Sequence, residues 1–162
     1  MKQSFDDLDY QILLALQEDG RRSASDVARR LNANERTIRK RIDRLMNSGA
    51  VRLTAILDPS AFGYATAVDI FLDVDPAHED EVVATLKGMA EISYIAFGQG
   101  TRELSIEGRF KSNDEMHEFL RRRLPALPGV TVRGYALVPR ILRNIDEWIP
   151  AARDFSPRRT ED

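Results

Sequence analysis

The sequence predicts an α+β fold in two parts: an N-terminal three-helix helix-turn-helix unit and a C-terminal ferredoxin-like βαββαβ sandwich. Two short helical patterns separated by a tight turn lie between Ser23 and Gly49. Strand and helix patterns then follow one another in the order βαββαβ from residue 67. The charge changes as well, because residues 1–58 carry a net charge of +2 and residues 59–162 a net charge of −4. The two parts are therefore expected to have different partners.

The first predicted helix begins near Asp7, where acidic residues suit the helix dipole, and ends at Gly20. Its apolar residues recur with helical spacing and give it one side to bury: Leu8, Ile12, Leu13 and Leu16. Short helices are not stable alone, so we expect this helix to pack across the two that follow.

The next two helices form the predicted helix-turn-helix. Ser23 is a suitable N-cap for the first, residues 32–34 form the turn, and Asn34 caps the second. Apolar residues spaced i, i+4 and i+7 define the buried side of the second helix: Ile38, Ile42 and Leu45. Gly49 lies where a left-handed residue would end that helix. In such a motif the second helix enters the DNA major groove.

Charge supports this interpretation. Residues 21–52 contain ten Arg or Lys and three acidic residues, a net charge of +7, whereas the whole chain has −2. A basic segment in an acidic chain is typical of DNA binding; solvated helix faces are the alternative. The residues expected to reach base edges are Arg36, Thr37, Arg39 and Lys40. Those expected to meet phosphates are Arg22, Arg29, Arg30, Arg44 and Arg52, and Ser25 is a further DNA-binding candidate. Arg41 is expected either to join them or to turn back onto the domain.

Composition excludes several classes of protein. Hydrophobic residues make up 43% and charged residues 31%, which indicates a globular protein with a core. No apolar run approaches the ~20 residues that a membrane helix needs, and the N-terminus lacks the apolar core of a signal peptide. A cytoplasmic protein is the expectation. There is no cysteine, phosphate loop, Ser/His/Asp order or metal-ligand spacing, so we expect no enzyme, cofactor or metal.

The C-terminal part is predicted element by element. The strands are residues 67–75, 92–97, 103–110 and 130–138, and the helices are residues 76–89 and about 113–124. This order predicts a four-stranded antiparallel sheet with both helices on one face. Simple alternation places Phe71, Ile95, Phe97, Tyr135 and Leu137 on the open face, a patch that another subunit would bury. The alternative is a register slip that turns these residues toward the core.

The predicted domain boundaries follow the breaks in these patterns. Residues 1–52 form the DNA-binding domain, residues 53–64 a linker strand or hinge, residues 65–143 the sandwich and residues 144–162 a tail. The segment from Val51 to Leu57 has a strand-like composition that ends at Asp58-Pro59. In the tail, Trp148 is expected to anchor a docked segment, and the chain from Ser156 is expected to be disordered.

Three stretches carry a resemblance to the Lrp/AsnC family of transcription regulators, and together they cover about residues 6 to 143. The opening Asp7-Leu8-Asp9, with Ile12-Leu13 and Glu18-Asp19-Gly20-Arg21, is similar to the family's first helix. Thr37-Ile38, Arg41-Ile42 and Leu45, followed by Gly49-Ala50-Val51, resemble its recognition helix and exit. Leu127-Pro128-Gly129-Val130 resembles the entry to its last strand.

The resemblance implies a winged-type helix-turn-helix and a sensing sandwich that dimerises and assembles further to tetramers or octamers. It also implies a small effector, commonly an amino acid, bound near the turn between the second and third strands. The residues this selects are Gly98, Gly100, Thr101, Arg102, Glu103, Arg133 and Tyr135. Glu103 stands where the family often has Asp, and Arg133 and Tyr135 stand near frequent threonines, so the ligand class stays open. Glu103 is alternatively a surface strand residue.

Two other functions compete with a specific, effector-controlled regulator. Some members of the family organise DNA with little sequence demand, and the basic helix fits that equally well. Some similar proteins are sirohaem decarboxylases that use histidines in a basic and tyrosine cluster. Here the two histidines, His78 and His117, lie outside any such cluster and are expected to be ordinary exposed side chains.

Overall fold

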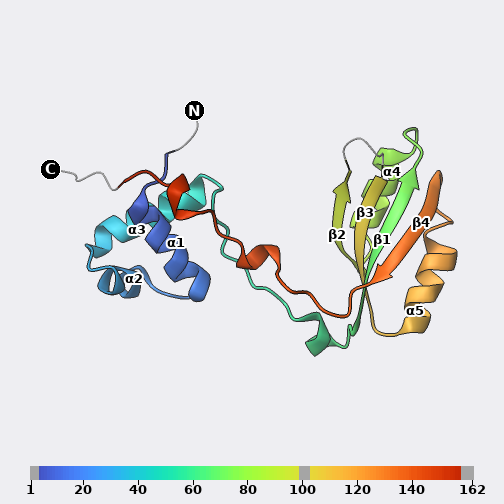
Figure 1. The fold of residues 1–162 in the computed structure, drawn as a ribbon, viewed down its shortest axis with the longest axis horizontal. Coiled ribbons are helices and arrows are strands. Elements are labelled where there is room, and N and C mark those ends of the chain that lie inside the picture. Colours follow the sequence, from blue (N-terminus) through green and yellow to red (C-terminus); the bar gives the residue numbers. More distant parts are fainter. Residues whose placement is uncertain (1–3, 99–102, 158–162) are drawn as a thin grey trace. The chain divides into compact units, whose positions relative to one another are not determined.

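A computed structural model describes residues 4–98 and 103–157. The chain divides into two compact units, one formed by Met1–Ile56 with Arg143–Asp162 and the other by Leu57–Leu142 (Figure 1). The predicted linker, residues 53–64, contains the first change of unit. The residues predicted to form the C-terminal tail, 144–162, fall in the N-terminal unit. The chain therefore passes between the units twice.

The N-terminal unit contains the predicted three helices: α1 (Asp7–Glu18), α2 (Ala24–Arg30) and α3 (Glu35–Asn47). Polar side chains begin each one, since Asp6, Ser23 and Asn34 each accept a backbone N–H of the first turn. The helices enclose a small core of Leu8, Ile12, Ala15, Leu16, Val27, Ala28, Ile38 and Leu45. The helix-turn-helix prediction is confirmed.

The ends of α2 and α3 are marked by residues with positive φ, in the turn and at the glycine where the sequence predicted these helices to end. Asn32 has a positive φ of 47° in the turn after α2, and Gly49 has a φ of 74° just after α3. The amide of Gly49 donates to Met46 O at 3.0 Å, and the amide of Val51 donates to Leu45 O at 3.3 Å. These bonds occupy carbonyls that α3 would otherwise leave unpaired.

The predicted strand from Val51 to Leu57 is wrong for the single chain, because these residues have no regular secondary structure. A strand needs a neighbouring strand to pair its backbone groups, and the described part of the chain supplies none here. No β-hairpin follows α3 within the described residues, so the wing that the resemblance implied is not seen there. Asp58 instead caps a short 3₁₀ turn, Pro59–Phe62, that ends at Gly63 with a φ of 85°.

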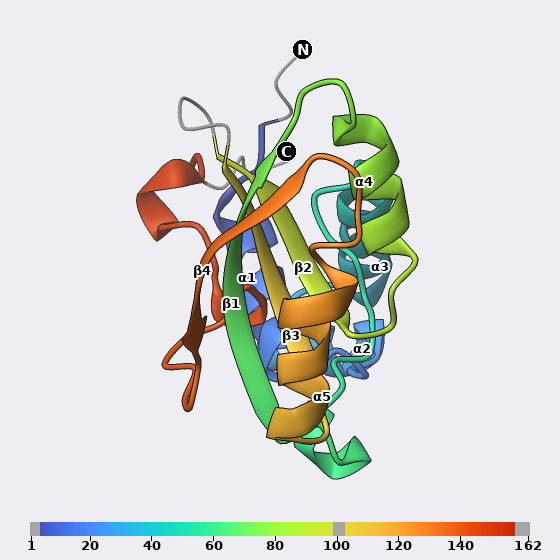
Figure 2. The same ribbon diagram turned by 90° about the vertical axis from the view of Figure 1, so that its right-hand side faces the viewer.

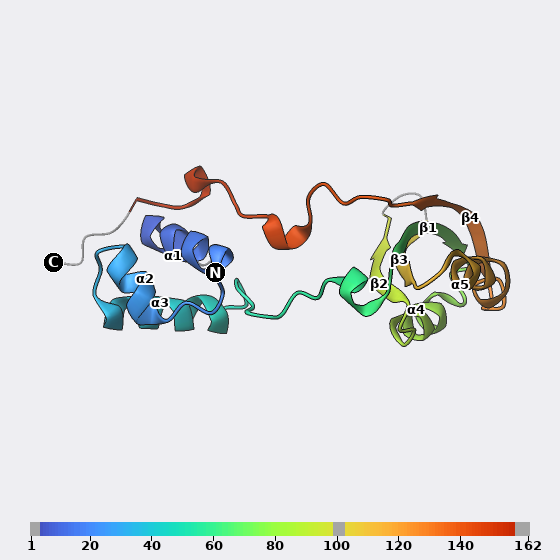
Figure 3. The ribbon, with the colours of Figure 1, turned by 90° about the horizontal axis from the view of Figure 1, so that it is seen from below.

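The C-terminal unit has the predicted βαββαβ order. Its elements are β1 (Thr66–Val74), α4 (Glu79–Lys87), β2 (Ile92–Phe97), β3 (Glu103–Phe110), α5 (Asn113–Glu118) with a π-helical turn (Phe119–Arg123), and β4 (Val130–Leu137). The strands are antiparallel in the order β2-β3-β1-β4. Both helices lie on one face of the sheet (Figures 2 and 3). The predicted fold class is confirmed.

Alternate residues of β1 and β3 form the larger core beneath these helices. It comprises Val68, Ile70, Leu72, Val74, Val82, Leu86, Leu104, Ile106, Phe110, Met116, Phe119, Leu120 and Leu124. The rings of Phe110 and Phe119 pack at 5.2 Å between centroids. Gly108 makes this possible, because a Cβ there would lie 2.7 Å from the Phe110 ring.

The predicted apolar patch on the open face is mostly wrong, because the register places four of its five residues on the helix side. Opposed residues of antiparallel strands share a face. Ile95 and Phe97 oppose Ile106 and Leu104. Tyr135 and Leu137 oppose Ile70 and Val68 in the same way. The fifth residue, Phe71, opposes Ser105 and Gly134 on the open face.

The cause is a break in register in each edge strand. The β2–β3 pairing shifts between Ile92 and Tyr94, and the β1–β4 pairing shifts opposite Phe71 and Leu72. One extra residue reverses the side to which every later side chain of that strand points. Alternation counted from Ile92 or Val130 therefore assigns the wrong face beyond the break.

Candidate nucleic-acid interface

The inner side of α3 is fixed by charge as well as by its apolar residues. The guanidinium of Arg41 bonds Asp6 Oδ1 at 2.6 Å and Asp9 Oδ1 at 3.0 Å. Arg44 pairs with the other Asp9 oxygen. Asp6 and Asp9 also accept each other's backbone N–H, at 3.1 and 3.0 Å. Asp9 is fully buried. These four side chains, here called the charge clamp, join the start of α1 to α3.

The clamp shifts the ionisation of its members. Burial opposes ionisation of Asp6, but hydrogen bonds from Arg41 and the Asp9 amide outweigh it and lower the pKa of Asp6. Burial likewise opposes the charged form of Arg41, whereas its bonds to Asp6 and Asp9 raise its pKa. Arg41 is therefore turned back onto the domain as a permanent cation, the second of the two positions expected for it.

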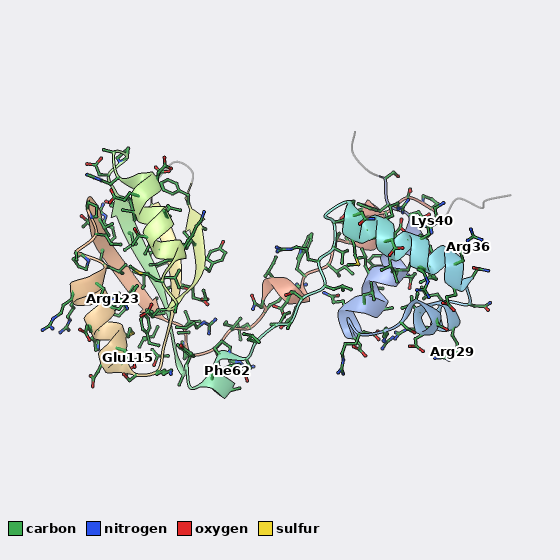
Figure 4. The ribbon with its side chains drawn as sticks, turned by 180° about the vertical axis from the view of Figure 1, so that it is seen from behind. Arg29, Arg36, Lys40, Phe62, Glu115 and Arg123 are labelled. Carbon is green, nitrogen blue, oxygen red and sulfur yellow. The ribbon has the colours of Figure 1, made fainter. Side chains whose placement is uncertain are left out.

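The outer side of α3 carries a polar stripe at positions i, i+4, i+7 and i+11: Arg36, Lys40, Asp43 and Asn47. All four residues are exposed. Arg36 and Lys40 lie one turn apart near the start of the helix (Figure 4). Neither has an acidic partner within residues 4–98 and 103–157. They are the cations of α3 that a phosphate or a base edge could reach without displacing a carboxylate.

The other two predicted base contacts are placed differently. Arg39 donates to Glu35 at 2.6 Å, one turn earlier on the same helix, and its side chain keeps 64% exposure. An exposed pair of this kind contributes little, so Arg39 can exchange its partner. Thr37 is half-buried at the edge of the outer surface.

Several predicted phosphate contacts already hold carboxylates. Arg30 makes two bonds to Glu18, at 2.5 and 2.6 Å, and Arg22 bonds the same group at 2.9 Å. The Arg30 bonds, followed by the Arg22 charge, lower the pKa of Glu18. Arg29 pairs with Asp26 and projects from α2 (Figure 4). DNA phosphates would therefore compete with acidic groups for these arginines.

The remaining predicted DNA contacts lie around the helix pair. Ser25 is exposed on α2, and Arg52 is exposed after α3. Arg44 keeps 46% exposure although it holds Asp9 and lies 5.9 Å from the Phe5 ring. Its role as a phosphate contact stays a prediction. The sequence did not reveal the clamp, because the acids of α1 were explained by the helix dipole alone.

The predicted effector residues are only partly brought together. Three of them lie outside the described residues: Gly100, Thr101 and Arg102. The amide of Gly98 donates to Glu103 O at 2.8 Å, beside that gap. Glu103 opposes Asp73 in the sheet, and Arg133 bonds Asp73 Oδ2 at 2.9 Å. These three charges gather around β1 on the open face, whereas Tyr135 shares the helix side with Ile70. Sequence reasoning had missed Asp73.

Three other features of the described residues bear on function: metal-ligand groups, surface cavities and membrane-spanning helices. No group of three or more His, Asp or Glu residues could hold a metal ion there. A surface cavity of about 270 Å³ on α5 is lined by His117, Glu118, Arg121 and Arg122. None of the described helices has the length and apolar character needed to cross a membrane.

Known proteins resemble the chain both in sequence and in fold. The AsnC-type helix-turn-helix domain family matches residues 5–46. A helix-turn-helix transcriptional regulator of Pyrococcus furiosus is 33% identical over 144 residues, which cover 88% of this chain and 95% of the relative. The structure of E. coli AsnC superposes with a TM-score of 0.79 at 21% identity, covering 89% of this chain and 99% of AsnC.

A transcriptional regulator of Neisseria meningitidis, solved in complex with L-methionine, superposes with a TM-score of 0.80 at 19% identity. That match covers 87% of this chain and 94% of the regulator. Likenesses at these low identities establish the fold. The Pyrococcus relative, with its identity and coverage, establishes the family. The chain belongs to the Lrp/AsnC family of helix-turn-helix transcriptional regulators, and its function is regulatory rather than enzymatic.

Proposed function

We propose that this regulator recognises specific double-stranded DNA sequences by placing the N-terminal half of α3 in the major groove. The polar stripe carries the proposal: Arg36 and Lys40 face outward without acidic partners in the described chain, while Arg41 holds the opposite side. Arginine can bond guanine O6 and N7 together, which makes it the commonest specific contact. Phosphate contacts from the surrounding arginines would set the position of the helix.

The roles within this interface differ. Arg36, Thr37, Arg39 and Lys40 are proposed to read base edges, with Arg39 leaving Glu35 on binding. The proposed phosphate contacts are Arg22, Ser25, Arg29, Arg30 and Arg52. Arg44 is proposed to position α3 through Asp9 and to add phosphate attraction from its exposed end.

A homodimer is part of the proposal, because two recognition helices read a two-fold related site. The open face of the sheet is the proposed contact. It presents Phe71 and Tyr94 together with Ala96 and Ala136, and neither α4 nor α5 covers it (Figure 3). A half-apolar face of this kind is suited to a second copy. Further assembly to tetramers or octamers belongs to the same proposal.

A small effector is proposed to change that assembly, with an amino acid as the first candidate. Asp73, Glu103 and Arg133 place two carboxylates and a guanidinium together on the open face. Such a set can bind both ends of a zwitterion, and the Neisseria relative was solved with L-methionine. Light scattering with L-methionine and other amino acids tests this. A change in mass with one amino acid supports the proposal, and no change with any contradicts it.

The test of specific DNA binding is fluorescence anisotropy with the protein's own upstream duplex and a scrambled duplex, at two salt concentrations. We expect Arg36→Ala to weaken binding to the cognate duplex about ten- to a hundredfold and to affect the scrambled one less. Arg121→Ala, an exposed arginine of the other unit, is the control. Equal losses on both duplexes would indicate a DNA-organising protein with low sequence demand.

A further inference from the structure

The C-terminal segment after the sandwich returns to the DNA-binding unit and runs along α1. The side-chain amide of Gln17, near the end of α1, donates to Asp146 O at 3.3 Å and Trp148 O at 3.4 Å. At the other end of α1, the rings of Tyr10 and Phe155 pack at 4.9 Å between centroids. The segment therefore follows α1 in the opposite direction and contacts both of its ends.

The segment ends in a short parallel pairing with the chain before α1. Ser156 donates its backbone N–H to Phe5 O at 3.0 Å and accepts the Asp7 N–H at 2.9 Å. Its hydroxyl also donates to Phe5 O at 3.2 Å. The prediction that disorder begins at Ser156 is therefore wrong for that residue, and residues 158–162 lie outside the described chain. Pairing partners more than 140 residues apart were not visible in local patterns.

The anchor is also different from the predicted one. The Trp148 side chain is 58% exposed, and only its carbonyl joins Gln17. Phe155 is the more buried aromatic residue of the segment. Ile145, in contrast, is 78% exposed although it lies in the same segment. Phe155 and Ile145 thus provide, for comparison, an apolar side chain that packs on α1 and one that is largely exposed.

The chain that pairs with Ser156, residues 5–7, also contacts the recognition helix α3. Asp6, between the two residues paired with Ser156, bonds Arg41 of α3. Phe5, whose carbonyl accepts from Ser156, lies under the Arg44 guanidinium. The contacts therefore run from the C-terminal segment through the pre-α1 chain to α3.

We propose that the segment from Arg143 to Ser156 is a fourth element of the DNA-binding unit that positions the recognition helix through Phe5, Asp6 and the charge clamp. A chain end before a helix frays unless something pairs with it. When Ser156 is removed, Phe5 O and the Asp7 N–H lose their partner, and Asp6, which lies between them, then holds Arg41 from a less ordered segment. The orientation of α3 would be less defined, and DNA would have to order it on binding.

The arrangement also gives the sandwich two connections to the DNA-binding unit. The chain enters β1 after the linker and leaves from β4, and these strands are neighbours in the sheet. Val138 N donates to Ala67 O at 2.9 Å, so both connections start from the same end of the sheet. One connection continues α3, and the other reaches α1.

The test compares two truncated chains by hydrogen exchange without DNA. Removal of the residues after Asn144 should raise exchange of the first-turn amides of α1 and the amides of α3 by at least about tenfold. The Asp7 N–H loses Ser156 O, and the segment before α1 that holds Arg41 through Asp6 loses its support. Exchange in the sandwich should stay unchanged. Removal of only the residues after Pro157, which keeps Ser156, is the matched control. Unchanged exchange in α1 and α3 of the shorter chain overturns the proposal.

Point substitutions give the same comparison in a chain of full length. Phe155→Ala should raise exchange at the start of α1, and Ile145→Ala should leave it unchanged. DNA affinity is then measured; this readout rests on the proposed DNA binding. We expect Phe155→Ala to weaken it roughly two- to tenfold, the range of an aromatic pair. Equal effects of both substitutions on exchange overturn the positioning role. If the two substitutions change hydrogen exchange as expected but the full-length chain does not bind DNA, the result counts against the proposed function alone.

Discussion

Each of the two units is stabilised internally in a different way. The sandwich unit buries thirteen apolar residues between a sheet and two helices, whereas the DNA-binding unit buries eight and adds a charge clamp and a returning segment. Small cores contribute little net stability, so polar contacts decide more of the smaller unit's geometry. The difference shows that the same chain specifies one unit mainly by apolar pattern and the other partly by long-range polar pairing.

The largest expected effect is in the sandwich core. Phe110→Ala should lower the free energy of unfolding of that unit by about 3–5 kcal/mol, because it removes a buried ring packed on Phe119 and Gly108. Urea unfolding followed by hydrogen exchange in each unit measures it. Phe62→Ala, an exposed phenylalanine of the same unit, should change stability by less than about 0.5 kcal/mol. A comparable loss in the DNA-binding unit would contradict separate stabilisation.

The charge clamp gives the next largest effect, in the other unit. Asp9→Asn keeps the shape but removes the charge between Arg41 and Arg44, and we expect a loss of about 3 kcal/mol. Asp7→Asn, an exposed acid of the same helix turn, is the control. Thermal unfolding of both variants measures the difference. If Asp9→Asn is as stable as Asp7→Asn, the clamp contributes specificity without stability.

These two cases show what the sequence could predict. The helices of both units follow from apolar spacing and caps such as Ser23 and Asn34, because these signals are local. The order of strands follows from element order. The side of the sheet on which Ile95 and Tyr135 lie could not be predicted. A bulge earlier in each strand reverses that side, and no residue pattern in the sequence indicates the bulge. The partners of Asp9 and Ser156 are far away in the chain, so periodicity carries no information about them.

Low pH should destabilise the DNA-binding unit more than the sandwich unit. The pKa of Asp6 is lowered in the folded state, so its contribution is present above its ordinary value of about 3.9 and is lost as the pH falls below it. The pKa values of Glu18 and Asp26 in the same unit are lowered too, and in the sandwich unit those of Asp58 and Glu91 are lowered. Asp6 differs from all four because its carboxylate bonds the cation that holds the recognition helix. We expect the DNA-binding unit to lose stability below about pH 4. Hydrogen exchange in each unit at pH 3 to 6, corrected for the intrinsic rate, measures this. A steeper loss in the sandwich would contradict it.

The smallest effect is expected at the surface pair of α3. Glu35→Gln should change stability by less than about 0.5 kcal/mol, since exposed i,i+4 pairs contribute little. DNA affinity should nevertheless rise at low salt, because Arg39 loses its competing partner and one negative charge leaves the surface near the phosphates. Glu115→Gln, an acid of the sandwich unit, is the control for net charge. If both variants raise affinity equally, net charge explains the gain. If only Glu35→Gln raises it, the gain is local to the Glu35–Arg39 pair and the outer side of α3 is the interface.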